Sequence, residues 1–167
     1  DQHAAHERLL YEEIKQKIAE QGLARQRLLI PEIVEINDNI ALERLQSQRD
    51  ELHKMGLVFE KFGDNAVIIN ETPSLLGEIN VQQLVKDLAD NLLELGENVA
   101  LAELIEHVTE TFACHHAIRS GRKMNIAEMN ALLRKMEATD FSGQCNHGRP
   151  TYVKMELKDI EKLFGRR

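Results

Sequence analysis

The sequence lacks the features that mark membrane, secreted and disulfide-rich proteins. It has only two cysteines, Cys114 and Cys145, which are too few for a disulfide framework and fit a reducing compartment. No apolar run approaches the roughly 18 residues that a transmembrane helix needs, and no signal-peptide pattern opens the chain. We therefore expect a cytoplasmic protein that has no membrane association.

Positive charge is also scarce. The 21 Lys and Arg residues are outnumbered by 28 Asp and Glu residues, so the formal net charge is −7. This balance argues against tight, unaided binding of nucleic acid to a basic surface. Any contact with DNA or RNA is expected to be local or assisted by a partner.

The chain length and composition are those of a soluble globular protein. The 167 residues correspond to one domain, or to two small subdomains that share a core. A hydrophobic fraction of 43% and a charged fraction of 29% argue against intrinsic disorder. Because helical and extended patterns are mixed without a strict βαβ repeat, we predict an α+β fold.

Apolar residues at helical spacing, with polar caps before them and glycines after several of them, predict the helices. These are expected at residues 4–21, 38–55, 81–95, 99–118 and 125–138, with a last short helix around Ile160, Leu163 and Phe164.

Extended segments are expected at fewer places. Residues 32–36 form one, and two short apolar runs flank Gly63-Asp64-Asn65, which has the composition of a hairpin turn. Alternation at residues 151–155 predicts a further strand. Gln26–Pro31 is expected to be an exposed connector.

The start of the first helix carries a candidate metal site. His3 and Glu7 are four residues apart, a spacing that places an imidazole and a carboxylate on one helix face, within reach of one cation. Asp1 lies beside them, and His6 and Glu12 widen the choice of ligands. The alternative is that acidic residues only stabilise the positive end of the helix dipole.

A second candidate lies in a glycine-rich loop near the end of the chain. Cys145 and His147 are separated by one residue and could chelate zinc, while Gly148 lets the backbone turn tightly behind them. Cys114 could supply another soft ligand, or it could be a small buried apolar residue. A Cys-His catalytic pair for acyl transfer is less favoured, because no third partner is evident to orient the base.

The candidate ligands taken together mix nitrogen, oxygen and sulfur donors. Such a set suits zinc best, although its carboxylates could also recruit manganese or magnesium. The set is His3, Glu7, Cys114, Cys145 and His147.

Two other groups of residues have both a functional and a structural interpretation. Arg119, Arg122 and Arg149 could hold a phosphate near a metal, although a solvated basic helix end also explains the first two. The peptide Gln26–Pro31 could dock in a groove of a partner. Alternatively, its apolar residues are part of the core.

Four short strings are the most distinctive part of the sequence. They are DQHAAHERLLYE from Asp1, ACHHAIRSGRKM around Cys114, CNHGRP from Cys145, and FGR at Phe164 to Arg166. In this order they resemble the motifs of the C-terminal domain of the MutL family of DNA mismatch-repair proteins, in its endonuclease-bearing branch. QRLLIP, which begins at Gln26, is similar to the sliding-clamp-binding peptide of that family. The resemblance covers essentially the whole chain.

The resemblance implies a domain organisation and a function. It implies a homodimer with a dimerisation and endonuclease subdomain at residues 1–30 and 110–167 and an external regulatory subdomain at residues 31–109. The activity implied is nicking of one strand of double-stranded DNA, with a sliding clamp and other mismatch-repair proteins as partners. The family places strands and an ATPase domain before its first motif, so we expect this chain to be part of a longer protein.

The resemblance also implies roles for individual residues. The metal ligands of the family correspond to His3, Glu7, Cys114, Cys145 and His147, with Asp1 as an essential acidic group. Asp1, His3 and Glu7 would then serve metal-assisted phosphodiester hydrolysis with Mn²⁺ or Mg²⁺, while Zn²⁺ would be regulatory or structural. Arg119, Arg122 and Arg149 are candidates for contact with DNA. The clamp-binding residues would be Gln26, Leu28, Leu29, Ile30 and Pro31.

Two rival functions remain open. One is a non-catalytic dimerisation and sliding-clamp docking module, in which zinc at Cys114, Cys145 and His147 is structural. His3, Glu7 and Asp1 favour the nuclease over this module, because they add hard ligands that a closed structural site does not need. The other rival is a small cysteine-dependent hydrolase, which predicts inactivation by a thiol alkylator without any metal requirement.

Overall fold

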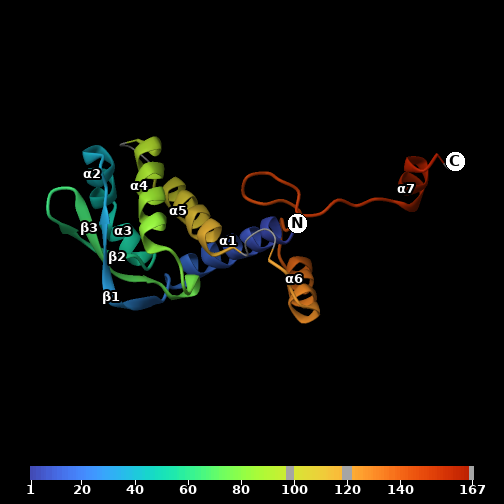
Figure 1. Cartoon of the computed structure of the whole chain (residues 1–167), viewed down its shortest axis with the longest axis horizontal. Helices are drawn as coiled ribbons and strands as arrows, with labels where there is room; N and C mark the ends of the chain where they lie inside the picture. The colour runs from blue at the N-terminus through green and yellow to red at the C-terminus, as the bar shows by residue number, and fades with distance from the viewer. Residues whose placement is uncertain (97–99, 118–121, 166–167) are drawn as a thin grey trace.

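The computed structural model of the chain describes residues 1–96, 100–117 and 122–165 (Figure 1). The helices are α1 (Gln2–Glu20), α2 (Asn39–Ser47), α3 (Arg49–Lys54), α4 (Val81–Leu95), α5 (Leu101–His116), α6 (Ile126–Ala138) and α7 (Leu157–Leu163), with a 3-10 turn η1 (Ser74–Leu76). The strands are β1 (Arg25–Glu35), β2 (Val58–Phe62) and β3 (Ala66–Pro73). Helices combined with a small antiparallel sheet confirm the predicted α+β class.

The sheet has the strand order β1-β3-β2, and both neighbouring pairs are antiparallel. β2 and β3 form the predicted hairpin, whose turn contains Gly63 at φ +66°, a conformation that favours glycine. Phe59 of β2 pairs with Ile69 of β3, and both side chains are almost fully buried. The sheet therefore presents an apolar face for helices to cover.

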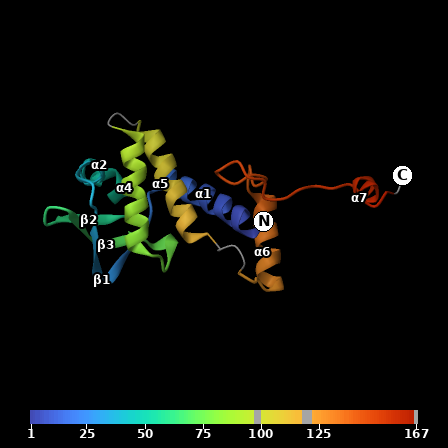
Figure 2. The same cartoon turned by 45° about the horizontal axis from the view of Figure 1, so that its top comes forward.

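Helix α4 packs against this sheet, and α5 lies between α4 and α1 (Figures 1 and 2). Along α4, residues at helical spacing such as Leu84 and Leu88 are buried. α5 contributes Phe112 and α1 contributes Ile14, each of them 0% exposed. One continuous apolar core therefore joins the sheet to the first helix.

This core draws on both predicted subdomains. Ile14 and Phe112 belong to the predicted part made of residues 1–30 and 110–167, whereas Leu88 belongs to residues 31–109. The division into two subdomains stays a prediction. None of the described helices is both long enough and apolar enough to span a membrane.

Helix α6 lies against α1, at the end of the molecule remote from the sheet (Figure 1). It begins at the predicted capping pair: Glu128 N donates to Asn125 Oδ1 at 2.9 Å, and Asn125 N donates to Glu128 Oε2 at 2.8 Å. Lys135 joins it to α1 through Glu13, with 2.5 Å between Nζ and Oε2. None of its side chains is buried.

After α6 the chain forms a loop and then an arm that carries α7 away from the other elements (Figures 1 and 2). α7 confirms the predicted last short helix. Large apolar side chains are exposed on this arm, namely Tyr152, Val153, Met155, Leu157, Leu163 and Phe164. The neighbouring α6 exposes Ile126, Met129 and Leu133.

The predicted connector at Gln26–Pro31 is wrong, because these residues belong to strand β1. Gln26 pairs with Thr72 of β3 and Arg27 pairs with Glu71, before the register shifts between Arg27 and Glu32. This strand depends on a partner that is distant in the sequence, so the local pattern does not reveal it.

Two other predictions need correction. Residues 151–155 form no strand, and their surroundings offer only an isolated bridge between Gln144 and Pro150, because the sheet lies at the other end of the molecule (Figure 1). The predicted helix at residues 38–55 is divided at Gln48 into α2 and α3. The bend leaves both Leu45 and Leu52 fully buried. Core packing therefore accounts for the bend, since no glycine or proline stands at it.

Candidate metal centre

The N-terminal part of α1 holds two of the predicted ligands, His3 and Glu7. Asp1 Oδ1 accepts from the backbone N–H groups of His3 at 2.9 Å and Ala4 at 3.2 Å, which satisfies donors that a helix start leaves free. His3 Nε2 lies 3.7 Å from Glu7 Oε2, and the Glu7 side chain is 4% exposed. The two side chains therefore share one helix face, as their spacing predicts.

Two further predicted ligands come from the loop after α6. Cys145 N donates to Arg149 O at 2.8 Å, and Gly148 N donates to Cys145 O at 3.0 Å. Gly148 adopts φ +74°, which a residue with a Cβ rarely does, so the backbone can turn tightly here. This turn brings both Cys145 and His147 next to α1.

Glu7, Cys145 and His147 form a group that we call the cluster. Their ligand atoms, a carboxylate oxygen, Sγ and an imidazole nitrogen, all lie within 4.8 Å of one another. His147 Nδ1 is 2.9 Å from Glu7 Oε1. Glu7 and Cys145 are buried, whereas His147 is exposed and gives the cluster one side open to solvent.

The cluster has the properties of a cation site. Glu7 Oε1 is buried but accepts no hydrogen bond, so its short approach to His147 is not a hydrogen bond in geometry. A buried carboxylate oxygen without a donor is costly, and a bound cation would satisfy it. Oxygen, sulfur and nitrogen donors at such separations fit zinc.

The other two predicted ligands, His3 and Cys114, are not members of the cluster. His3 touches it through Glu7. Cys114 lies in the last turn of α5 and is exposed as a residue, yet burial around its sulfur raises the pKa of its thiol. The carboxylates of Glu7 and Asp87 raise that pKa further.

The comparison of the sequence with known protein families decides where the chain belongs. Residues 1–124 match the family model of the MutL C terminal dimerisation domain. The chain belongs to this family.

Individual relatives agree with this family. The chain is 63% identical over 167 residues to the DNA mismatch repair protein MutL of Rickettsia bellii, 61% identical over 166 residues to that of Rickettsia akari, and 60% identical over 166 residues to that of Rickettsia felis. These alignments cover 99 to 100% of this chain but 27% of each relative. The chain therefore spans about a quarter of the length of these relatives.

The three arginines predicted to contact DNA have different surroundings in this MutL-family domain. Arg119 lies outside the described residues. Arg122 Nη2 lies 2.6 Å from Glu128 Oε1, so this guanidinium forms an ion pair with the first turn of α6. Arg149 is exposed and stands two residues after His147. Both described arginines are exposed, and Arg149 is the one that belongs to the loop of the cluster.

The peptide predicted to bind a sliding clamp lies where β1 bulges out of the sheet. Four residues, Leu28–Pro31, separate the pairs formed by Arg27 and Glu32 with β3, so their backbone leaves the ladder. Leu29 is 99% exposed and Ile30 is 76% exposed, whereas Leu28 is half-buried. Gln26 and Pro31 are exposed as well. The alternative in which all the apolar residues of this peptide join the core is therefore wrong.

Two residues near the cluster were not predicted to have a role, namely Arg8 and Asn146. Arg8 Nη2 lies 3.0 Å from Glu12 Oε1, so Glu12 pairs with Arg8 and does not join the cluster. The i, i+4 spacing of Arg8 and Glu12 was the available signal. Arg8 Nη1 donates to Asn146 Oδ1 at 3.3 Å.

His6 does not join the cluster either. Its ring lies 6.3 Å from that of His116, between centroids. Burial, and then the charge of His116, lower the pKa of His6 to about 4.

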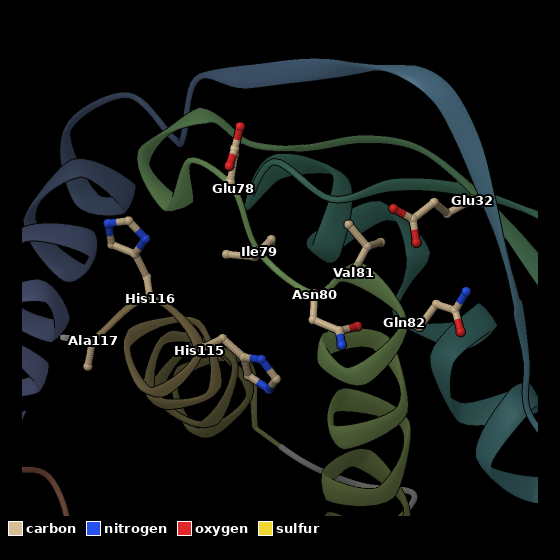
Figure 3. A pocket seen from close by; sticks show the side chains of 9 residues that line it. All are labelled: Glu32, Glu78, Ile79, Asn80, Val81, Gln82, His115, His116 and Ala117. Carbon is tan, nitrogen blue, oxygen red and sulfur yellow. The ribbon is translucent and has the colours of Figure 1, made fainter. Parts of the chain in front are cut away.

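A larger pocket of about 840 Å³ lies elsewhere, between β1, the start of α4 and the end of α5 (Figure 3). It contains none of the residues that the sequence predicts for a site. His115 Nε2 lies 2.8 Å from Asp87 Oδ2 and is therefore already paired. Glu32 and His116 lie on opposite sides of the pocket (Figure 3). The side chains that line this pocket do not converge on one point. We therefore do not assign the chemistry to this pocket, although it is large.

Proposed function

We propose that this domain is the metal-dependent, DNA-nicking endonuclease and homodimerisation part of a MutL-type mismatch-repair protein. The observation that supports it most is the buried Glu7 Oε1, which accepts no hydrogen bond and faces the imidazole of His147 beside Cys145. Membership of the MutL C-terminal dimerisation domain family supports the same proposal.

The residues of the cluster would hold zinc, and Asp1, His3 and Glu7 would serve the catalytic manganese or magnesium. A bound metal ion supplies an activated water and neutralises charge at the scissile phosphate. Burial fixes the position of the Glu7 carboxylate, and the cap at the start of α1 fixes that of Asp1. Cys114 would complete the soft ligands. Arg149 would steady a phosphate of the DNA backbone.

Dimerisation is supported by the apolar surface at the end of the molecule remote from the sheet. α6 exposes Ile126 at 78%, and the arm exposes Val153 at 76% and Phe164 at 79%. Large apolar side chains left exposed on neighbouring segments of the chain are typical of a surface that another protein covers. We propose that a second copy of the chain covers α6 and the arm.

A sliding clamp would deliver the domain to DNA. The net charge of −7 disfavours autonomous binding to DNA. Tethering through the exposed bulge of β1 would raise the local concentration of DNA at the cluster without any new contact between the domain and DNA. Other mismatch-repair proteins would then act on the same assembly.

Nicking of supercoiled plasmid tests the catalytic part of the proposal. The domain is incubated with Mn²⁺, with and without a sliding clamp, beside the variant Glu7→Gln. Glu20→Gln is the matched control, because Glu20 lies exposed at the other end of α1 and bonds only Gln16 among the described residues. We expect Glu7→Gln to lose nicking and Glu20→Gln to keep it. Nicking by Glu7→Gln at the wild-type rate would contradict the proposal.

A second pair of variants tests delivery by the clamp. Gln26→Ala combined with Leu29→Ala should abolish the stimulation of nicking by the clamp and leave metal binding unchanged. Ile33→Ala is the control, since Ile33 is an exposed apolar residue of the same strand outside the bulge. Equal loss of metal binding and of clamp stimulation would refute this division of labour.

The non-catalytic module remains the second candidate. It is favoured by the donors of Cys145 and His147 within the cluster, which suit a structural zinc. It predicts that chelation of zinc lowers the melting temperature, while no divalent metal produces nicking with or without a clamp.

A further inference from the structure

The loop that carries Cys145 and His147 is a preformed unit that must be held against α1. Thr151 N donates to Gly143 O at 3.0 Å and Thr151 Oγ1 donates to Ser142 O at 2.6 Å, so the two ends of the loop are tied together. These bonds are internal to the loop and do not determine its position on α1. The distance between Cys145 or His147 and Glu7 therefore depends on the few contacts that cross from the loop to the helix.

Arg8 makes two of these crossing contacts. Its Nη1 donates to Asn146 Oδ1 at 3.3 Å, between the two ligands of the loop. Its guanidinium carbon lies 5.7 Å from the centroid of the Phe141 ring, a cation–π distance. Arg8 lines one pocket of about 360 Å³ together with Phe141, Cys145 and Asn146.

Arg8 is itself held firmly on α1. Glu12 Oε1 lies 3.0 Å from its Nη2, and its guanidinium carbon lies 5.4 Å from the centroid of the Tyr11 ring. The Arg8 side chain is 18% exposed. A planar guanidinium fixed on one side by α1 can orient the loop on its other side. Because Glu12 already pairs with the charge, Arg8 is better suited to orientation than to binding a phosphate.

Two features show that this contact is not arranged for stability alone. Phe141 has φ +59°, which is strained for a bulky side chain, and it is the one non-glycine residue with positive φ in the described ranges. Arg8 Nε and Asn146 Nδ2 are both buried without a hydrogen-bond partner. Strain and unsatisfied donors that persist together are typical of a functional site.

We propose that Arg8 is a positioning residue, which docks the loop on α1 through Asn146 and Phe141 and thereby sets Cys145 and His147 at metal-binding distance from Glu7. This inference rests on the proposed metal centre and adds a residue that makes its geometry. Partners outside the ligand shell typically change metal affinity by about 10–100-fold when they are removed.

Titration with Co²⁺ tests the proposal without any measurement of nuclease activity. Co²⁺ bound to a thiolate gives a charge-transfer absorption, so the spectrum reports whether Cys145 is in place. We expect Arg8→Met to weaken Co²⁺ binding by about 10–100-fold and to reduce this absorption at saturation. Lys15→Met is the matched control: Lys15 Nζ also lies near the Tyr11 ring, at 5.5 Å, but Lys15 is exposed on the middle of α1 and no described contact joins it to the loop.

Variants on the other side of the contact guard against a simple failure to fold. Asn146→Ala removes the acceptor in the loop and leaves α1 intact, so it should weaken Co²⁺ binding in the same direction. Arg8→Lys keeps the charge beside Glu12 and should recover part of the affinity lost in Arg8→Met. Circular dichroism checks that each variant is folded. Asn146→Ala, measured alone, decides the matter if Arg8→Met does not fold.

The outcomes separate this inference from the proposed function. A wild-type domain that binds no Co²⁺ at the cluster overturns both. Wild-type binding that is matched by Arg8→Met, or by Asn146→Ala if Arg8→Met is unfolded, overturns only the positioning role. Equal weakening in Lys15→Met would also overturn it, because the effect would then not pass through the loop.

Discussion

Replacement of Glu7 by glutamine should change the stability of the metal-free domain and its response to zinc in opposite directions. Glu7 is 3% exposed and its Oε1 has no hydrogen-bond partner. A glutamine has nearly the same shape and carries no charge, so it removes the cost of burying an ionised oxygen that accepts no hydrogen bond. An unsatisfied buried polar group costs about 1–3 kcal/mol, so without metal we expect the variant to be more stable by about that amount. For a chain of this size, each kcal/mol raises the melting temperature by about 2–4 °C.

Zinc should reverse this order. A ligand that binds only the folded state stabilises it by about 2.7 kcal/mol at a hundred times its dissociation constant. The wild-type domain should gain this stabilisation, whereas Glu7→Gln should gain little of it because one ligand is lost.

Thermal unfolding followed by circular dichroism measures both effects. The scans are made at pH 8, where free imidazole is uncharged, in chelator and in excess zinc, with Glu20→Gln as the exposed control on the same helix. The reasoning is refuted if Glu7→Gln is less stable than the wild type in chelator. It is refuted equally if zinc raises both melting temperatures by the same amount.

Three further predictions concern side chains of the helices around the site. Burial, and then the hydrogen bond to Glu106, raise the pKa of Tyr11 to about 12, so its contribution to stability should be present below pH 10 and lost as the pH rises toward 12; ultraviolet titration should show this late step, and Tyr11→Phe should lack it. Lys135→Met should break the link to Glu13 and speed hydrogen exchange throughout α6, while the free energy of unfolding changes by less than about 1 kcal/mol; unchanged exchange would show that other contacts hold α6. Phe112→Ala should destabilise the domain by about 3–5 kcal/mol in urea unfolding, because Phe112 is 0% exposed where α5 joins the core, and a loss below about 1 kcal/mol would contradict that packing.

The sequence by itself determined the features whose causes lie within a few residues along the chain. Asp1 caps α1, Asn125 and Glu128 form a capping box, and Gly63 turns the hairpin, because the hydrogen bonds concerned join close neighbours. The shared helix face of His3 and Glu7 follows in the same way from the 3.6-residue period. Residue type and helical spacing could therefore name candidate ligands, but not the distances between their atoms.

Strands were harder to predict from the sequence than helices. A strand forms only where another strand is free to pair with it, and that partner can be distant along the chain. Gln26 lies in β1 because Thr72 is opposite it, although its local pattern indicated a connector. Residues 151–155 alternate like a strand, yet no strand lies beside them in the described chain.

Only the tertiary structure decided which candidate residues share a site. Glu7 and Cys145 lie near opposite ends of the chain, and the tight loop packed on α1 brings their ligand atoms to within 4.8 Å. Cys114 is equally suited by residue type, but it is exposed on α5 and is not among the described residues whose ligand atoms come together. Arg8 was not a candidate by residue type, and only its contact with Asn146 connects it to the site. Residue types restrict the chemistry, whereas the distances on which metal binding depends are set by the packing of segments that are remote in sequence.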